Sequence, residues 1–275
     1  MRSTRPLAAL ALAAALAACG ESASTPAAPD APLRIVNGTP TGSAYGSVGA
    51  LLYDYDGNGR LDGWDQVCTG TLVSPTVFLT AAHCVNWVPA DARFYVTFDN
   101  ELFPAPKTVI AARSFHYDPA YGRDQGDPHD IAVVILPERS TRGVTPLRLP
   151  AAGTLDALAA KNGLGGRSFV NVGYGVSASR TGVPSFGYDG KRRVSTAEFS
   201  SLQGAWLDLL MNTAATGEGG DCYGDSGGPK FLQGQEDVVL GIVSTGDYPC
   251  RATSRNYRVD TPSARAFLGQ FMALP

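Results

Sequence analysis

Short apolar segments separated by turn residues recur along most of this 275-residue chain. The sequence contains 32 Gly and 19 Pro, and residues of these two types bound many of the apolar segments. Strand-like segments lie at 48–53, 67–73, 77–80, 93–98, 108–115 and 131–136, and a second series lies at 169–172, 192–199, 206–211 and 238–244. The pattern predicts an all-β protein of two antiparallel units, with 146–166 connecting them.

One helix is expected, and it comes last, over residues 261–273. Thr261 can cap it, and Pro262 suits its first turn because a missing N–H costs nothing there. Apolar residues follow at a spacing of three to four, so this helix should pack by one face.

The formal net charge is −3, which argues against a nucleic acid partner, since such partners select strongly basic surfaces. The length is ample for a buried core.

The first nineteen residues look like an export signal. Arg2 and Arg5 form a basic start, and an apolar run that is too short to span a bilayer follows. The run ends in Leu-Ala-Ala-Cys19, which resembles a bacterial lipoprotein signal in which Cys19 is lipidated; an ordinary cleaved signal with a chance cysteine is the alternative. Either interpretation predicts an exported protein.

Residues 20–34 are rich in Ala, Pro and Ser and predict a flexible tether or propeptide, so we expect the folded part to begin at residue 35. Without Cys19, four cysteines remain, Cys68, Cys84, Cys222 and Cys250. An even number in an oxidising compartment predicts two disulfides, and the count alone allows three pairings.

Three motifs carry candidate chemistry: TAAHC at 80–84, HDIAVV at 129–134 and GDSGGP at 224–229. A serine hydroxyl is a weak nucleophile that needs a base, a group to orient the base, and donors for the oxyanion that forms. His83, Asp130 and Ser226 can fill the three side-chain roles. The glycines around Ser226 permit a tight turn that exposes its hydroxyl.

The order of these residues selects between two folds. The segment around Ser226 also fits the Gly-x-Ser-x-Gly turn of α/β-hydrolases, in which the serine comes first and the histidine last. Here the order is His83, Asp130, Ser226, which is the order of chymotrypsin.

From Ile35 to its end, the chain resembles the chymotrypsin-like (trypsin-family) serine proteases. The resemblance implies two six-stranded antiparallel β-barrels, over about 35–145 and 146–258, and a C-terminal helix. It also implies an endopeptidase that works through an acyl-enzyme, with His83 as base and acid, Asp130 orienting it and Ser226 attacking. The N–H groups of Gly224 and Ser226 would form the oxyanion hole, and no cofactor would be required.

The resemblance further implies that Cys68 pairs with Cys84 and Cys222 with Cys250. The segment from Arg34 through Ile35 to Gly38 resembles a zymogen cleavage site. In the family, the freed ammonium, here that of Ile35, pairs with the aspartate before the nucleophile, which is Asp225.

Specificity is less clear from the sequence. Trypsin-like members carry an acidic residue six positions before the nucleophile, where this chain has Gly220. Asp221 follows and could present a carboxylate to Lys or Arg, unless a local group such as Arg251 or Arg255 neutralises it. Ser244 and Gly246 match the substrate strand of the family, with Thr245 between them in place of Trp. We expect a preference for cleavage after Lys or Arg; a broad or apolar preference is the alternative.

Residues 54–65 fit a twelve-residue calcium loop, with oxygen ligands at alternate positions and Gly at the sharp turn. The candidate ligands are Asp54, Asp56, Asn58, the Arg60 carbonyl, Asp62 and Asp65. A solvated Asp- and Gly-rich hairpin loop is the alternative, because strands rather than helices flank the segment.

Two other functions remain open, a non-peptidase esterase and a catalytically inactive binding homologue. We expect a monomer that contacts protein or peptide substrates and reaches a membrane only through a lipid on Cys19.

Overall fold

The computed structural model describes residues 36–179 and 182–275. The predicted signal, the tether, Cys19, Arg34 and Ile35 lie outside the described residues.

The first β unit is a curled antiparallel sheet in the strand order β6-β5-β2-β3-β4-β8-β7. Its strands are β2 (Val48–Tyr53), β3 (Gln66–Ser74), β4 (Val77–Thr80), β5 (Phe94–Thr97), β6 (Ile110–Ala111), β7 (Ser114–Tyr117) and β8 (Ala132–Ile135). The sequence predicts one strand over 108–115, but the structure divides this segment between β6 and β7. The unit therefore has seven strands in an open, curled sheet rather than six in a closed barrel.

The second β unit is a closed barrel of six strands, because β9 pairs with both β14 and β12. Its strands are β9 (Ser168–Gly173), β12 (Arg193–Gln203), β13 (Trp206–Leu210), β14 (Pro229–Leu232), β15 (Gly241–Gly246) and β16 (Thr253–Arg258). Strand β1 (Thr39–Pro40) adds to the edge of β12, and β10 (Ser177–Ala178) pairs with β11 (Phe186–Gly187) in a separate hairpin. The predicted all-β class is confirmed.

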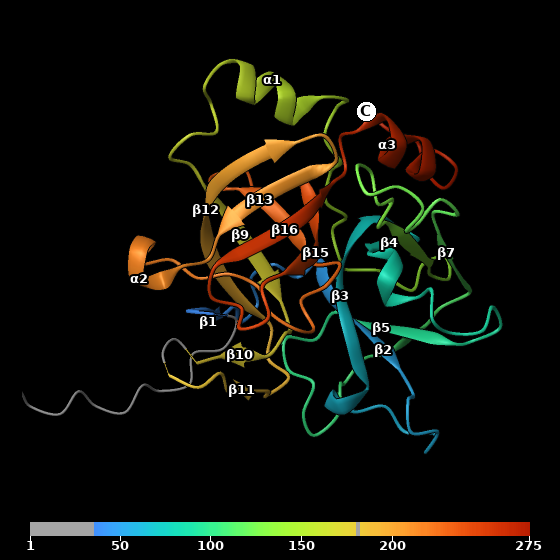
Figure 1. The fold of residues 1–275 in the computed structure, drawn as a ribbon. Helices are drawn as coiled ribbons and strands as arrows, with labels where there is room; N and C mark the ends of the chain where they lie inside the picture. The colour runs from blue at the N-terminus through green and yellow to red at the C-terminus, as the bar shows by residue number, and fades with distance from the viewer. Residues whose placement is uncertain (1–35, 180–181) are drawn as a thin grey trace, which may run out of the picture. The chain divides into compact units, whose positions relative to one another are not determined.

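The described part of the chain has three α-helices: α1 (Thr154–Ala160), α2 (Thr213–Thr216) and α3 (Pro262–Leu268). Thr261 caps α3 by accepting a hydrogen bond from Ala264 N, as predicted. The helix ends at Leu268 rather than at 273, where Gly269 follows as its C-cap. Its apolar face joins the core of the first unit although it follows the second unit in the chain (Figure 1).

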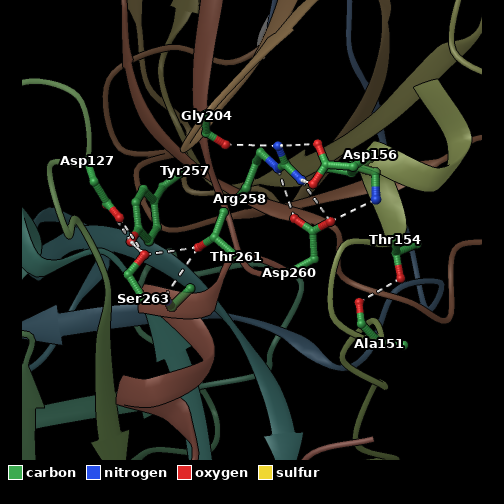
Figure 2. Close-up of polar contacts among 12 residues, drawn as sticks. Asp127, Ala151, Thr154, Asp156, Gly204, Tyr257, Arg258, Asp260, Thr261 and Ser263 are labelled. Carbon is green, nitrogen blue, oxygen red and sulfur yellow. Dashed lines mark hydrogen bonds and ion pairs between the residues drawn. The ribbon is translucent and has the colours of Figure 1, made fainter. Parts of the chain in front are cut away.

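Arg258 at the end of β16 anchors the connection between the two units. Its buried guanidinium contacts Asp156 of α1 at 2.8 Å and Asp260 at 2.9 Å. The Asp260 carboxylate also accepts a hydrogen bond from Leu155 N at 2.7 Å, so it ties the first turn of α1 to the start of α3 (Figure 2). Within the described ranges, no helix has the length and hydropathy needed to cross a bilayer.

Candidate active site

His83 and Asp130 meet at one edge of the first sheet. Strands β4 and β8 pair antiparallel with Thr80 opposite Ala132, so the residues just after Thr80 lie beside those just before Ala132. Asp130 Oδ2 lies 2.8 Å from His83 Nδ1, and Asp130 Oδ1 accepts a hydrogen bond from His83 N at 3.0 Å. A buried carboxylate therefore holds both the ring and the backbone of His83.

Ser226 lies in a tight turn just before β14, and the turn packs against β3. Its carbonyl accepts a hydrogen bond from Thr69 N at 2.9 Å. Gly227 has a φ of +77°, and an added Cβ there would lie 2.1 Å from Thr80 Oγ1. Only glycine fits this position, because both the backbone conformation and the close approach of the first unit exclude a side chain.

The backbone at Gly224 is held by β3 of the first unit. Its carbonyl accepts hydrogen bonds from Gln66 Nε2 at 2.8 Å and Thr69 Oγ1 at 2.9 Å. Among the described residues, neither Gly224 N nor Ser226 N donates a hydrogen bond. Two backbone donors beside one serine are thus available to a ligand oxygen.

His83 and Ser226 line one cavity of about 300 Å³. A second depression on the other side of His83 is lined by Asp130, Tyr121 and Trp206, among others. His83 therefore lines two neighbouring depressions, an arrangement that could accommodate an extended ligand.

The segment before Asp130 is held by the C-terminal part of the chain. Asp127 accepts hydrogen bonds from the Tyr257 hydroxyl at 2.9 Å and from the Ser263 hydroxyl (Figure 2). Asp127 also accepts a hydrogen bond from His129 N at 3.2 Å. The position of Asp130 therefore depends on β16 and α3 as well as on its own sheet.

Asp225 is a buried carboxylate beside the serine, with 2% of its surface exposed. It accepts hydrogen bonds from Gly175 N at 2.8 Å and Cys222 N at 2.9 Å, and no ion pair to it occurs among the described residues. Burial, followed by the nearby Asp221 carboxylate, raises the pKa of Asp225 to about 7. A cation beside Asp225 would strongly stabilise the ionised form of this carboxylate.

Val36 is buried beside the same loop. Its carbonyl accepts a hydrogen bond from Gly220 N at 3.0 Å. Val36, the residue after Ile35, is therefore hydrogen-bonded to Gly220, which lies five positions before Asp225 in the sequence.

Asp221 lines the cavity, but its carboxylate is already bound. One oxygen pairs with Lys230 Nζ and the other accepts a hydrogen bond from Ser254 Oγ at 2.5 Å. Asp221 is therefore neutralised by a neighbouring cation, which was one of the alternatives. The cation is Lys230 rather than Arg251 or Arg255. Arg255 instead pairs with Asp208, at 2.9 Å.

Arg251 does not neutralise Asp221 by any contact that the structure shows for it. Its guanidinium donates to Ser179 O at 2.5 Å and to Gly182 O at 3.0 Å. This arginine fastens the β10–β11 hairpin to the segment beside the cavity.

Of the other residues predicted for the specificity pocket, Ser244 and Gly246 line the cavity and Gly220 does not. Ser244 also donates its hydroxyl to Asp130 Oδ2 at 2.5 Å. At Gly220, an added Cβ would lie 2.2 Å from Met211 Sδ. The Met211 side chain therefore occupies the space that an acidic residue at 220 would need.

The disulfides pair Cys68 with Cys84 and Cys222 with Cys250, as the resemblance implies. The first bridge joins β3 to the short helical turn that carries His83. The second bridge forms part of the cavity wall.

The predicted calcium loop lies between β2 and β3. The carboxylates of Asp54, Asp56 and Asp65 have oxygens within 4.8 Å of one another. Asp62 does not join this group; all five side chains, that of Asn58 included, accept hydrogen bonds from backbone N–H groups of the loop. Three of the predicted ligands therefore converge, and calcium binding stays a prediction.

We expect millimolar Ca²⁺ to raise the Tm by about 5 °C, because a cation would relieve repulsion among the three carboxylates. Burial raises the pKa of Asp65, with the neighbouring Asp62 and Asp54 carboxylates acting in the same direction. Thermal unfolding with Ca²⁺, with Mg²⁺ and with EDTA measures the effect. An identical Tm in all three would contradict it.

Lys230, Met211 and Tyr223 were not predicted as site residues. Met211 and Tyr223 line the cavity, and Lys230 pairs with Asp221 of the cavity wall. The available signal for Lys230 was a charged residue between the GDSGGP motif and the apolar Phe231 and Leu232. A cation there requires a partner, since a buried lysine is rarely left unpaired.

The family model described as Trypsin matches residues 50–268. The chain therefore belongs to the trypsin family. It is 30% identical over 210 residues to glucanase inhibitor protein 4 of Phytophthora infestans, covering 72% of this chain and 76% of that protein. It is also 30% identical over 235 residues to trypsin, alkaline C of Manduca sexta, covering 82% of this chain and 86% of that protein.

Among solved structures, human heparin binding protein has the same fold, with a TM-score of 0.63. The two sequences are 18% identical, and the match covers 88% of this chain and 98% of that one. This likeness supports the fold alone.

Proposed function

We propose that the chain is a serine endopeptidase. The observation that carries the proposal is the Asp130-bound His83 ring lining one cavity with Ser226, whose own N–H and that of Gly224 have no other acceptor among the described residues. These groups supply a base, its orienting carboxylate, a nucleophile and two oxyanion donors in one place.

In the proposed reaction, Ser226 Oγ attacks the peptide carbonyl carbon while its proton passes to His83 Nε2. The N–H groups of Gly224 and Ser226 stabilise the oxyanion that forms. His83 then donates the proton to the leaving amine, and an acyl-Ser226 ester remains. Water attacks this ester by the same route, which releases the acid and restores the serine.

The test is covalent labelling with a phosphonate that reacts with activated serines. We expect one label per molecule, on Ser226. The Ser226→Ala and His83→Ala variants should not be labelled. A Ser185→Ala variant serves as the matched control, because that serine lies on the hairpin away from the reacting groups. Absence of label on the processed native chain would contradict the proposal.

The same labelling experiment, with peptide and ester hydrolysis, distinguishes the two alternative functions, an esterase and an inactive binding protein. An esterase would be labelled and would hydrolyse simple esters but not peptides. An inactive binding protein would not be labelled, and one relative is named an inhibitor rather than a protease. The favoured proposal keeps all three side-chain groups, which a purely binding role does not need.

We further propose that cleavage after Arg34 activates the enzyme through pairing of the Ile35 ammonium with Asp225. The support is a buried Asp225 carboxylate with no ion-pair partner among the described residues, and the hydrogen bond from Gly220 N to the Val36 carbonyl. The expected preference for Lys or Arg loses its main support, because Asp221 is already ion-paired.

Export, and attachment through a lipid on Cys19, are proposals from the N-terminal sequence. The two disulfides lie wholly within the protease part, so cleavage after Arg34 would also release the enzyme from the lipid. We expect intact mass and N-terminal sequencing to find lipid on the membrane-bound form and Ile35 as the first residue of a soluble form. Active enzyme that begins at Ile35 and stays in the membrane fraction would contradict release.

A further inference from the structure

Lys230 is a fully buried lysine on β14, four residues after Ser226. Its ammonium donates to Asp221 and to Asn171 Oδ1 at 2.6 Å. Asn171 is its direct cross-strand partner on β9. A buried ammonium with two oxygen partners stays charged most readily when one partner is a carboxylate, as here.

The carboxylate of Asp221 has no oxygen left without a partner. It binds Lys230 through Oδ1 and accepts a hydrogen bond from Ser254 through Oδ2. Asp221 has 5% of its surface exposed and is the buried one of two acidic residues that line the cavity, the other being Asp247. The charge that the cavity presents at this point is therefore close to zero.

Most of the cavity surface is apolar. Its lining includes Met211, Val243 and the Cys222–Cys250 disulfide. Lys230 does not line the cavity; it acts on Asp221 from behind the wall.

A cationic substrate side chain would meet a neutral ion pair here. It would lose its hydration, and the Lys230 ammonium would offset its attraction to Asp221. The other carboxylate of the lining, Asp247, already accepts hydrogen bonds from three backbone N–H groups. An apolar side chain loses nothing on entering and gains from burial against Met211 and Val243.

We propose that Lys230 makes this a protease for uncharged, apolar residues before the cleaved bond, by neutralising Asp221 from beneath the pocket. The inference rests on the proposed serine endopeptidase function. It names the substrate class of the same site.

The test is a panel of fluorogenic peptides that differ only in the residue before the cleaved bond, with Leu, Met, Phe, Lys, Arg and Glu at that position. For the processed native enzyme, we expect kcat/KM to be at least about tenfold higher for Leu, Met or Phe than for Lys or Arg. Faster cleavage after Lys or Arg would overturn the inference.

Lys230→Met removes the ammonium and nearly keeps the side-chain volume. It leaves Asp221 without its cation, so the ratio of kcat/KM for Arg to that for Leu should rise by more than about tenfold. Lys161→Met, at an exposed lysine of α1's C-cap, is the matched control and should leave the ratio unchanged. A folded Lys230→Met enzyme with the native ratio would overturn the role of Lys230.

If Lys230→Met does not fold, Asp221→Asn gives the complementary result. It keeps the shape of the wall and leaves the ammonium without a carboxylate partner, so cleavage after Glu should rise relative to Leu and cleavage after Arg should fall. An unchanged profile would overturn the inference. Phosphonate labelling of Ser226 runs in parallel: a labelled enzyme with the wrong preference refutes the specificity alone, whereas an unlabelled, inactive chain refutes the proposed function.

Discussion

Replacing Asp130 with asparagine should lower kcat about 10⁴-fold at neutral pH, the magnitude known for the corresponding change in the chymotrypsin-type template. One carboxylate oxygen lies against His83 Nδ1 and also accepts the Ser244 hydroxyl, and the other accepts His83 N. An amide group keeps the shape but offers an NH₂ where one of these acceptors is needed. The ring then loses the tautomer that leaves Nε2 free to take the Ser226 proton.

The chain offers a matched control in its second aspartate–histidine pair. His129 Nδ1 lies 2.9 Å from Asp118 Oδ2. Asp118→Asn makes the same chemical change 12 positions earlier in the sequence, and it should lower kcat less than about tenfold because His129 has no part in the proposed reaction. Steady-state kinetics and circular dichroism of both variants provide the comparison. Equal losses would mean that Asp130 acts through folding rather than by orienting His83.

Cleavage after Arg34 should remove a loss of stability that the uncleaved chain suffers as pH rises. In the uncleaved chain, burial raises the pKa of Asp225 to about 7 from an ordinary 3.8. The folded state then binds a proton that the unfolded state has released, so the free energy of unfolding falls as pH rises from about 4 to 7. A difference of about three pKa units corresponds to about 4 kcal/mol.

The freed Ile35 ammonium would favour the ionised form of Asp225 and remove this loss until the amine itself deprotonates, near pH ~8. We expect Arg34→Gln, which blocks cleavage, to lose about 4 kcal/mol of unfolding free energy between pH 4.5 and 8 relative to the processed enzyme. The uncleaved form should also be at least about 10²-fold less active, as for loss of an oxyanion donor.

Urea unfolding of both forms at several pH values measures the stability difference. Adding Asp225→Asn to Arg34→Gln should flatten its pH dependence, because the amide does not titrate. Parallel pH profiles for the processed and the uncleaved chain would rule out Asp225 as the receiver of the new ammonium.

The arrangement of His83 and Asp130 was predictable because each follows or precedes a strongly apolar strand. The predicted segment 77–80 coincides with β4, and 131–136 contains β8. Antiparallel pairing of two such strands places their adjoining loops at one edge of the sheet. The motif order then assigned the serine to the second unit.

Strand β16 was not predicted, because its buried positions are polar. Ser254, Asn256 and Arg258 are all buried there, and each is satisfied by residues far away in the sequence. Apolar periodicity cannot detect such a strand, since the compensating partners appear only in the folded chain. The same reason hid the pairing of Lys230 with Asp221. Helix α1 was missed because only Leu155 among its residues is fully buried.

The ion pair behind the pocket wall affects how substrate preference can change in proteins of this architecture. Lys230 touches no substrate, yet one codon change there would alter the charge that a substrate meets. Comparing only the residues that line such a pocket would group this chain with enzymes whose acidic wall residue is unpaired. Selection, or a designer, can therefore retune recognition from inside the barrel while every surface of the cleft keeps its shape.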